Sequence, residues 1–367
     1  MKVALVHDFL TQYGGAEKVL EVLHEVWPDA PVYTLFYDKN GFGDKFKGWD
    51  IRVSPIQNLP FGVSHYRWYL GLMPMAIERF DLRGYDLVIS AASGCAKGIL
   101  THKNTKHFSY CYSPTRYLWS DAYDYLNGLR SGEKIFRKLL PPLLTYLRNW
   151  DYLAAQRADK IIAISDFIKK RIKKYYHREA DAIIYPPVEV NQFYISPEIG
   201  DYYLLVSRLR PYKKIDLAIQ AFNKLKIPLK IIGTGQDASL KKIAGPFIEF
   251  LGSVDEETKA KYLSHCKALI FPQEEDFGIV PVEAMASGRP VIAYRAGGAL
   301  EIVEEGKTGM FSNEQTWENL AETVIKFNPE NFDPKYIRSQ AEKFSKERFK
   351  KELLLFLREN APNLFEK

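Results

Sequence analysis

Two carboxylates, Glu275 and Glu283, lie eight residues apart in the stretch "EEDFGIVPVE", which directly follows the apolar run "KALIFP". A charge beside a buried strand costs stability unless something pairs with it. At the end of a strand, a carboxylate can accept hydrogen bonds from the hydroxyl groups of a sugar or a ribose. Gly278 predicts a tight loop, and the helix that Glu283 is expected to open offers unpaired backbone N–H groups. The alternative is a solvated loop in which Glu283 only favours the helix dipole.

A pair of cations follows another apolar run, in the stretch "SRLRPYKK". Arg208 and Lys213 flank Pro211, which indicates a turn after a strand. Across such a turn both cations can converge on one diphosphate, and a guanidinium can bind it with two hydrogen bonds. The alternative is an ordinary pair of basic surface residues.

Two glycines, Gly14 and Gly15, stand between the first apolar run and the helical pattern that follows it, in "TQYGGAEKV". Glycine lets backbone N–H groups approach a phosphate closely. The stretch is neither a Walker A loop nor G-x-G-x-x-G, so a plain turn is the alternative.

Several motifs are missing from the sequence. It contains no Asp-x-Asp, so a carboxylate pair holding a metal-nucleotide is not indicated. H-E-x-x-H and G-x-S-x-G are also missing, and the histidines form no cluster with metal-ligand spacing. We therefore expect no metal site and no cofactor. The lack of G-x-G-x-x-G disfavours a nicotinamide dehydrogenase.

The elements that carry these residues alternate between strand and helix patterns. A first series runs to "IIYPPVEV", where Pro186 and Pro187 predict a linker, and a second series begins at "YYLLVSRL". The pattern predicts an α/β fold with two doubly wound, Rossmann-like domains, residues 1–187 and 188–345. We expect the amphipathic tail, residues 346–367, to pack back on the first domain. Ligands of such sheets bind at the carboxyl ends of the strands, here in a cleft between two facing domains.

Composition limits where the protein works. The three cysteines, among 367 residues, form no C-x-x-C pair, which fits a reducing cytoplasm. "MKVALVHDFL" reads as a strand rather than a signal peptide. No run of about 18 apolar residues predicts a transmembrane helix. We expect Pro141 and Pro142 to break the most apolar segment, "KLLPPLLTYL".

Positive charge is concentrated in one region. Residues 103–178 hold 16 Lys and Arg against 6 Asp and Glu, a local +10, whereas the whole chain carries +6. Such a region could meet nucleic acid, an anionic membrane or a phosphorylated substrate, or it could be a solvated helical face. We expect no nucleic acid, because a binding module is missing, but a nucleic-acid-binding protein stays an alternative.

Together, "GGAEKV", "SRLRPYKK" and "EEDFGIVPVEAMASGRPVIAYRAGGALEIV" resemble, in this order, the retaining glycosyltransferases of family 4, whose two-domain architecture is called GT-B. The resemblance covers essentially the whole chain. "YCYSPTRYLW" and "QEEDFGIVPVE" further resemble bacterial mannosyltransferases that use GDP-mannose to build O-antigen or other cell-surface polysaccharide. This chain has Gln273 where glycine is common there, and Tyr112 where histidine is frequent.

The resemblance implies a role for each matching residue. Arg208 and Lys213 would neutralise the departing diphosphate in place of a metal. Glu283 would hold the ribose hydroxyls, and Glu275 would orient the transferred sugar without a covalent bond, because attack from the leaving-group face is usual in this family. The catalytic groups implied are thus Glu275, Arg208 and Lys213. Further donor-side contacts are implied for Gly14, Gly15, Phe277, Gly278, Ile279 and Val280, and for the base, Val254, Glu256 and Lys259.

Acceptor contacts are expected from the first domain, at His7, Asp8, Lys97 and Arg116. Lys97 and Arg116 could grip a lipid diphosphate. The implied partners are a nucleotide sugar and a saccharide or polyprenyl-diphosphate-linked acceptor, and the basic segment could dock on the inner face of an anionic cell membrane. A UDP- or ADP-sugar donor is the alternative within the same fold, and a two-domain epimerase matches the motifs less well.

Overall fold

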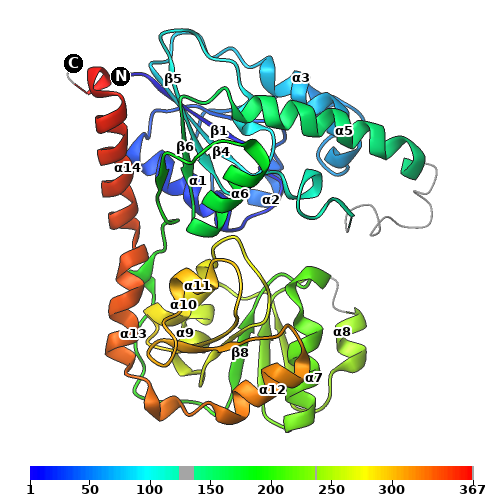
Figure 1. The fold of residues 1–367 in the computed structure, drawn as a ribbon, viewed down its shortest axis with the longest axis vertical. Coiled ribbons are helices and arrows are strands. Elements are labelled where there is room, and N and C mark those ends of the chain that lie inside the picture. Colours follow the sequence, from blue (N-terminus) through cyan, green and yellow to red (C-terminus); the bar gives the residue numbers. More distant parts are fainter. Residues whose placement is uncertain (124–135, 236–237, 366–367) are drawn as a thin grey trace. The chain divides into compact units, whose positions relative to one another are not determined.

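The computed structural model describes residues 1–123, 136–235 and 238–365 and divides into two compact units (Figure 1). Unit 1 comprises Met1–Tyr185 with Lys350–Lys367, and unit 2 comprises Pro186–Phe349. The first division lies next to the linker that Pro186 and Pro187 predict. The second falls inside helix α14 (Lys346–Asn360), four residues after the residue at which the sequence ends its second domain.

The sheet of unit 1 is parallel throughout, in the order β3-β2-β1-β4-β5-β6-β7. Its strands are β1 (Val3–His7), β2 (Val32–Thr34), β3 (Ile51–Val53), β4 (Leu87–Ala92), β5 (Lys106–Cys111), β6 (Lys160–Ala163) and β7 (Ala182–Ile183). Its helices are α1 (Gly15–Val26), α2 (Lys39–Phe42), α3 (Met73–Glu78), α5 (Phe136–Ala155), α6 (Asp166–Tyr176) and the part of α14 from Lys350. Every residue of the central strands β1 and β4 is buried, as expected for strands covered on both faces.

The sheet of unit 2 is also parallel, in the order β10-β9-β8-β11-β12-β13. Its strands are β8 (Tyr203–Val206), β9 (Leu229–Ile232), β10 (Ile248–Gly252), β11 (Leu269–Phe271), β12 (Val291–Tyr294) and β13 (Gly309–Ser312). Its helices are α7 (Ile215–Leu225), α8 (Ala238–Ile243), α9 (Glu256–His265), α10 (Ile279–Ala286), α11 (Ala299–Ile302), α12 (Trp317–Lys326) and α13 (Pro334–Ala341). The predicted α/β class with two doubly wound sheets is confirmed.

Local sequence explains where several helices begin. Ser165, Asp255 and Thr316 lie directly before α6, α9 and α12, and each side chain accepts a hydrogen bond from a backbone N–H of the first turn. These bonds satisfy donors that would otherwise lack a partner within the helix. The caps fix where the helix starts relative to the strand before it.

Two expectations about helices are wrong. The segment around Pro141 and Pro142 is not broken, because α5 runs through both prolines from Phe136 to Ala155. Each proline removes a backbone donor, and the helix is supported by packing of its apolar side on the core through Leu144 and Leu147. Glu283 does not open its helix, since α10 begins one turn earlier, at Ile279. In the part of the chain that the structure describes, no helix combines the length and the apolar character needed to cross a bilayer.

Candidate active site

The strand order of unit 2 reverses between β8 and β11. From β8 the chain proceeds outward to β9 and β10, and from β11 it proceeds in the other direction to β12 and β13. The loops that leave the carboxyl ends of two such strands diverge and leave a crevice, which is where open α/β sheets bind ligands. Here these loops carry Arg208 and Lys213 after β8, and Glu275 after β11.

Lys213 and Glu275 form an ion pair across this position. The Lys213 ammonium donates to Oε1 of Glu275, and both side chains are mostly buried, at 13% and 19% exposure. Arg208, on the same loop as Lys213, is exposed. The structure thus brings together one cation and one carboxylate of the predicted catalytic set, and leaves the second cation open to solvent.

Two glycines on the neighbouring strand support the loop that carries Arg208. Gly233 and Gly235 follow β9 with φ of +141° and +147°, which favours glycine. A Cβ on Gly233 would collide with the carbonyl of Ser207, and one on Gly235 with that of Leu209. The backbones are joined by hydrogen bonds, with the N–H of Leu209 donating to the carbonyl of Thr234 at 2.9 Å. This support was not predicted, although "GTG" directly after an apolar run is a visible signal.

A second pair of glycines supports the loop that carries Glu275. The N–H of Gly298 donates to the carbonyl of Glu275 at 2.9 Å. A Cβ on Gly298 would collide with the backbone of Phe277, and one on Gly297 with the carbonyl of Glu275. Phe277 itself is buried and packs on Phe344, with ring centroids 5.5 Å apart. The Glu275 loop is therefore held by the glycine turn through its backbone and by Phe344 through the Phe277 side chain. Gly278, Ile279 and Val280 follow it, partly exposed, at the start of α10.

Glu283 is buried, at 2% exposure, and has a cationic partner. The Lys259 ammonium lies 2.9 Å from Oε2 of Glu283 and 2.9 Å from Oε2 of Glu256. Lys259 is also buried, so the opposite charges offset much of the cost of desolvating each other. The structure thus joins a predicted ribose-binding residue to two predicted base-contacting residues. Val254 lies partly exposed just before α9.

In unit 1 the strand order reverses between β1 and β4, and Asp8 lies at this position. Its carboxylate accepts hydrogen bonds from the backbone N–H groups of Ser93 and Ala96, at 2.6 and 2.7 Å. Asp8 thereby fixes the loop after β4. Its neighbour His7 is buried, and Nε2 of His7 lies 3.4 Å from Oε1 of Glu17 in the first turn of α1. Gly14 and Gly15 lie at the start of the same helix, partly exposed.

Lys97 lies inside unit 1, at 2% exposure, 2.6 Å from Oδ1 of Asp151. Burial, the largest influence, lowers the pKa of Lys97, but the charge and hydrogen bond of Asp151 raise it above its ordinary value. Asp151 also accepts hydrogen bonds from the Thr115 hydroxyl at 2.7 Å and the Trp119 indole at 2.7 Å. This environment favours a structural role for Lys97, which ties the loops after β4 and β5 to α5. No sequence signal pointed to Asp151, which lies within a helical pattern.

Arg116 lies in the loop after β5, with its side chain one-third exposed. Its Nε donates to Oδ2 of Asp121 at 2.8 Å. Unlike Lys97, it lies at the surface of unit 1. Tyr112, one of the two residues that depart from the mannosyltransferase pattern, is buried and donates to the carbonyl of Ala16 at 3.0 Å.

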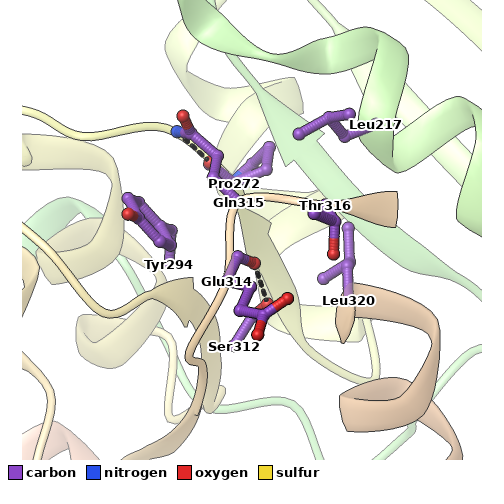
Figure 2. Close-up of a pocket in the computed structure, with 8 residues that line it drawn as sticks. All are labelled: Leu217, Pro272, Tyr294, Ser312, Glu314, Gln315, Thr316 and Leu320. Atoms are coloured by element: carbon purple, nitrogen blue, oxygen red, sulfur yellow. Dashed lines mark hydrogen bonds between the residues drawn. The ribbon is translucent and has the colours of Figure 1, made fainter. Parts of the chain in front are cut away.

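A hollow in unit 2 includes no residue that the sequence predicts for the candidate site (Figure 2). It is lined by Leu217, Pro272, Tyr294, Ser312, Glu314, Gln315, Thr316 and Leu320. The amide of Gln315 donates to the carbonyl of Pro272 at 3.0 Å, which fastens the end of β11. Across the described ranges, no group of three or more His, Cys, Asp or Glu side chains is arranged to hold a metal ion.

Comparison with known proteins agrees with this architecture. The family model described as "Glycosyltransferase Family 4" matches residues 13–192, and "Glycosyl transferases group 1" matches residues 191–344. An uncharacterized glycosyltransferase of Methanocaldococcus jannaschii is 31% identical over 94% of this chain and 93% of its own length. The alpha-1,3/1,6-mannosyltransferase ALG2 of Candida glabrata is 24% identical over 90% of this chain and 87% of its own length.

Solved structures share the fold at low sequence identity. The structure of HepE from Anabaena in complex with UDP has a TM-score of 0.72 and 18% identity, covering 97% of this chain and 99% of that chain. Sucrose-phosphate synthase from Thermosynechococcus elongatus has a TM-score of 0.74 and 17% identity, covering 97% and 98%. The fold and its relatives define a glycosyltransferase of the GT-B class. Within that class, the chain belongs to glycosyltransferase family 4.

Proposed function

We propose that this glycosyltransferase moves mannose from GDP-mannose to a saccharide or polyprenyl-diphosphate-linked acceptor in surface polysaccharide synthesis, with retention of configuration. The observation that carries the proposal is the meeting of two charged loops at the strand-order reversal of unit 2, where Lys213 pairs with Glu275. The choice of mannose rests on the motifs and on relatives such as ALG2, which are named as mannosyltransferases.

In this proposal, donor binding replaces the ion pair. The donor diphosphate becomes the ionic partner of the Lys213 ammonium and of Arg208, and the sugar hydroxyls donate hydrogen bonds to the Glu275 carboxylate. Both charges then keep a partner, which avoids leaving an unpaired charge in a mostly buried place. As the glycosidic bond breaks, negative charge grows on the diphosphate, and two fixed cations stabilise it without needing a metal ion.

The acceptor attacks from the face that the diphosphate leaves, and a diphosphate oxygen takes the acceptor proton. Glu275 orients the sugar and forms no bond with it. Glu283 receives the ribose hydroxyls, with Lys259 as its counter-charge. Acceptor contacts come from unit 1, with Arg116 favoured over the buried Lys97 as the group that meets an acceptor phosphate.

A thermal-shift experiment with GDP, UDP and ADP, in chelator and without added metal, tests the donor. A nucleotide well above its dissociation constant stabilises the folded protein measurably. Selective stabilisation by GDP supports the proposal and justifies transfer assays with GDP-mannose. Preference for UDP, which is bound in the HepE structure, would keep the fold and discard mannose as the sugar. A lack of any shift would contradict the nucleotide-sugar proposal.

A further inference from the structure

A group of large apolar side chains lies exposed on unit 1, along the 3-10 helix Tyr66–Leu72 and α3. We call Phe61, His65, Trp68, Leu72 and Met75 the aromatic patch. Phe61 is 64% exposed, Trp68 67% and Met75 50%. The rings of Phe61 and Trp68 lie 6.1 Å apart, and those of His65 and Trp68 4.5 Å apart. Single exposed apolar residues are common, but a contiguous group with Trp and Phe marks an interaction surface.

The aromatic patch is rigidly presented rather than part of a loose loop. Leu70, Met73 and Ile77, which alternate with its members, are buried in the core of unit 1. The Tyr69 hydroxyl donates to the carbonyl of Pro60 at 2.5 Å, which ties the helix to the segment before it. Phe61 has a φ of +56°, a conformation that costs a non-glycine residue free energy and persists only where the surroundings enforce it. The fold thus holds an exposed aromatic ring in a strained position.

The stretch of sequence that forms the aromatic patch contains no acidic residue, and the carboxylates that flank this stretch are paired. Residues 51–77 contain no Asp or Glu. The carboxylates that flank this stretch are both paired, Asp50 with Arg52 at 2.7 Å and Glu78 with Arg157 at 2.6 Å. The neighbouring face of α5, which touches Gly71 through Leu143, also contains no acidic residue between 140 and 150 and exposes Tyr146.

Unit 1 as a whole is cationic. It holds 30 Lys and Arg against 22 Asp and Glu, a net +8, whereas unit 2 holds 21 against 23, a net −2. An anionic surface therefore attracts unit 1 and not unit 2. The combination of net positive charge on unit 1, a stretch without Asp or Glu at residues 51–77, and exposed Trp and Phe suits the interface of a bilayer, where amphipathic aromatic rings are favoured.

We propose that the aromatic patch is a membrane-docking surface that inserts Phe61, Trp68 and Met75 at the headgroup boundary of a bilayer containing anionic lipids. The link to a lipid-linked acceptor rests on the proposed function, whereas the docking surface itself rests on exposure and charge alone. Insertion removes apolar side chains from water, and the net positive charge of unit 1 adds attraction that weakens as salt is raised. Docking through this surface holds unit 1, with its acceptor-side residues, at the membrane.

Vesicle flotation of the whole protein tests the proposal. We expect it to float with phosphatidylcholine vesicles that contain phosphatidylglycerol, and about tenfold less with phosphatidylcholine alone. Changing Phe61→Ser with Trp68→Ser should weaken flotation by about tenfold or more, because the two largest inserted surfaces are lost. The matched control, Tyr194→Ser with Ile325→Ser, removes two exposed apolar side chains of unit 2 and should float like the wild type. Equal flotation of the patch variant and the wild type, or none by the wild type, would overturn the proposal.

Fluorescence quenching supplies a second measurement, with a conservative aromatic substitution in place of the two serines. Lipids with brominated acyl chains should quench tryptophan emission in the wild type, and Trp68→Phe should lose most of that quenching while still floating. Quenching unchanged by this substitution would assign insertion to another tryptophan. Loss of self-association in the patch variant, without any flotation of the wild type, would make the surface an interface between copies and contradict lipid docking. The GDP thermal shift, measured on the same variants, should be unchanged, so failure of the nucleotide proposal is distinguished from failure of docking.

Discussion

Lys213 and Glu275 satisfy each other at the strand-order reversal of unit 2, while Arg208 stays exposed nearby. A mostly buried cation is retained at such a place only if something compensates its desolvation. The pair gives that compensation without a ligand, and a sugar diphosphate offers a replacement for both partners. The chemistry of the proposed site is therefore concentrated in three side chains on two loops.

Removing both cations, Arg208 and Lys213, tests whether the chemistry depends on these few side chains. Arg208→Ala with Lys213→Ala should reduce the rate of sugar transfer by about a thousandfold or more, since charge on the leaving diphosphate loses its stabilisation. Steady-state kinetics with the nucleotide sugar measures the effect. Arg210→Ala with Lys224→Ala removes the same charge from exposed positions nearby and should leave the rate within about threefold. A double variant at 208 and 213 with wild-type rates would refute the diphosphate grip.

His107 makes stability depend on pH. It is buried in unit 1, with Nε2 2.8 Å from the Ser90 hydroxyl, and burial lowers the pKa of His107 from 6.5 to about 4. Because the folded-state pKa is lowered, its contribution is present above pH 6.5 and is lost as pH falls toward 4. The free energy of unfolding should fall by about 3 kcal/mol across this window from His107 alone.

Urea unfolding at several pH values measures this dependence. His107→Gln should flatten the profile between pH 6.5 and 4, the range set by the two pKa values. His102→Gln, at an exposed position, serves as the control and should keep the wild-type slope. If the His107 variant shows the same slope as the control, another group carries the acid sensitivity.

At the scale of elements, each charged loop of unit 2 depends on a glycine turn from the next strand outward. Gly233 and Gly235 approach the Arg208 loop after β8, and Gly297 and Gly298 approach the Glu275 loop after β11. No side chain fits between these backbones. The turns therefore act as positioning elements for residues they do not belong to.

Gly298→Ala should displace the Glu275 loop, because the added Cβ meets the backbone of Phe277. Gly298 has an ordinary backbone φ of −65°, so the effect comes from the collision and not from helix-forbidden geometry. We expect nucleotide-sugar binding, measured by calorimetry, to weaken by about tenfold or more. Gly306→Ala, where a Cβ meets open space but a φ of +78° strains the backbone, controls for loss of stability without a collision at the Glu275 loop. Equal affinity in both variants would mean that the loop tolerates the shift.

Alternation of apolar runs with helical patterns was enough to predict both sheets. The start of α10 was missed because Pro281 and Gly278 read as a loop, while Gly278 in fact precedes the helix with a φ of +112°. The helix through Pro141 and Pro142 was missed because local propensity disfavours it and tertiary packing supports it. Both errors concern places where local preference and packing disagree.

Within the candidate site, residue types and order gave the candidates, but not their partners. Lys259 was expected to contact a base, and its pairing with Glu283 depends on how α9 packs against α10. Lys97 was expected to contact the acceptor, and its burial depends on Asp151, which is distant in sequence. Ion pairs between separate elements require the tertiary structure, which periodicity alone does not specify.

At the scale of the whole molecule, the predicted donor contacts are distributed unevenly between the two units. Nearly all predicted donor contacts belong to unit 2, and Gly14 and Gly15 are the exceptions in unit 1. The charge difference between the units follows the same division, since the cationic unit is the one proposed to meet lipid. Each unit has its own sheet and core, so a ligand can stabilise one more than the other.

Hydrogen exchange with and without GDP tests this division. Protection should increase most in unit 2, at the loops that carry Arg208, Glu275 and Lys259, where the nucleotide replaces solvent at the backbone. In unit 1 the increase should be confined to the start of α1, at Gly14 and Gly15. A uniform increase over both units would contradict the assignment of the nucleotide to unit 2. Protection limited to unit 1 would reverse the proposed roles.

The glycine turns have a consequence for anyone who redesigns the donor specificity of this protein. Because the turn after β9 touches the loop after β8, and the turn after β12 touches the loop after β11, these loops form two coupled pairs. A chimera that grafts one loop of a pair from a relative would bring a backbone shaped for a different neighbour. Loops should therefore be exchanged two at a time, and the smallest interchangeable part of the donor site is a pair of adjacent strands with their loops.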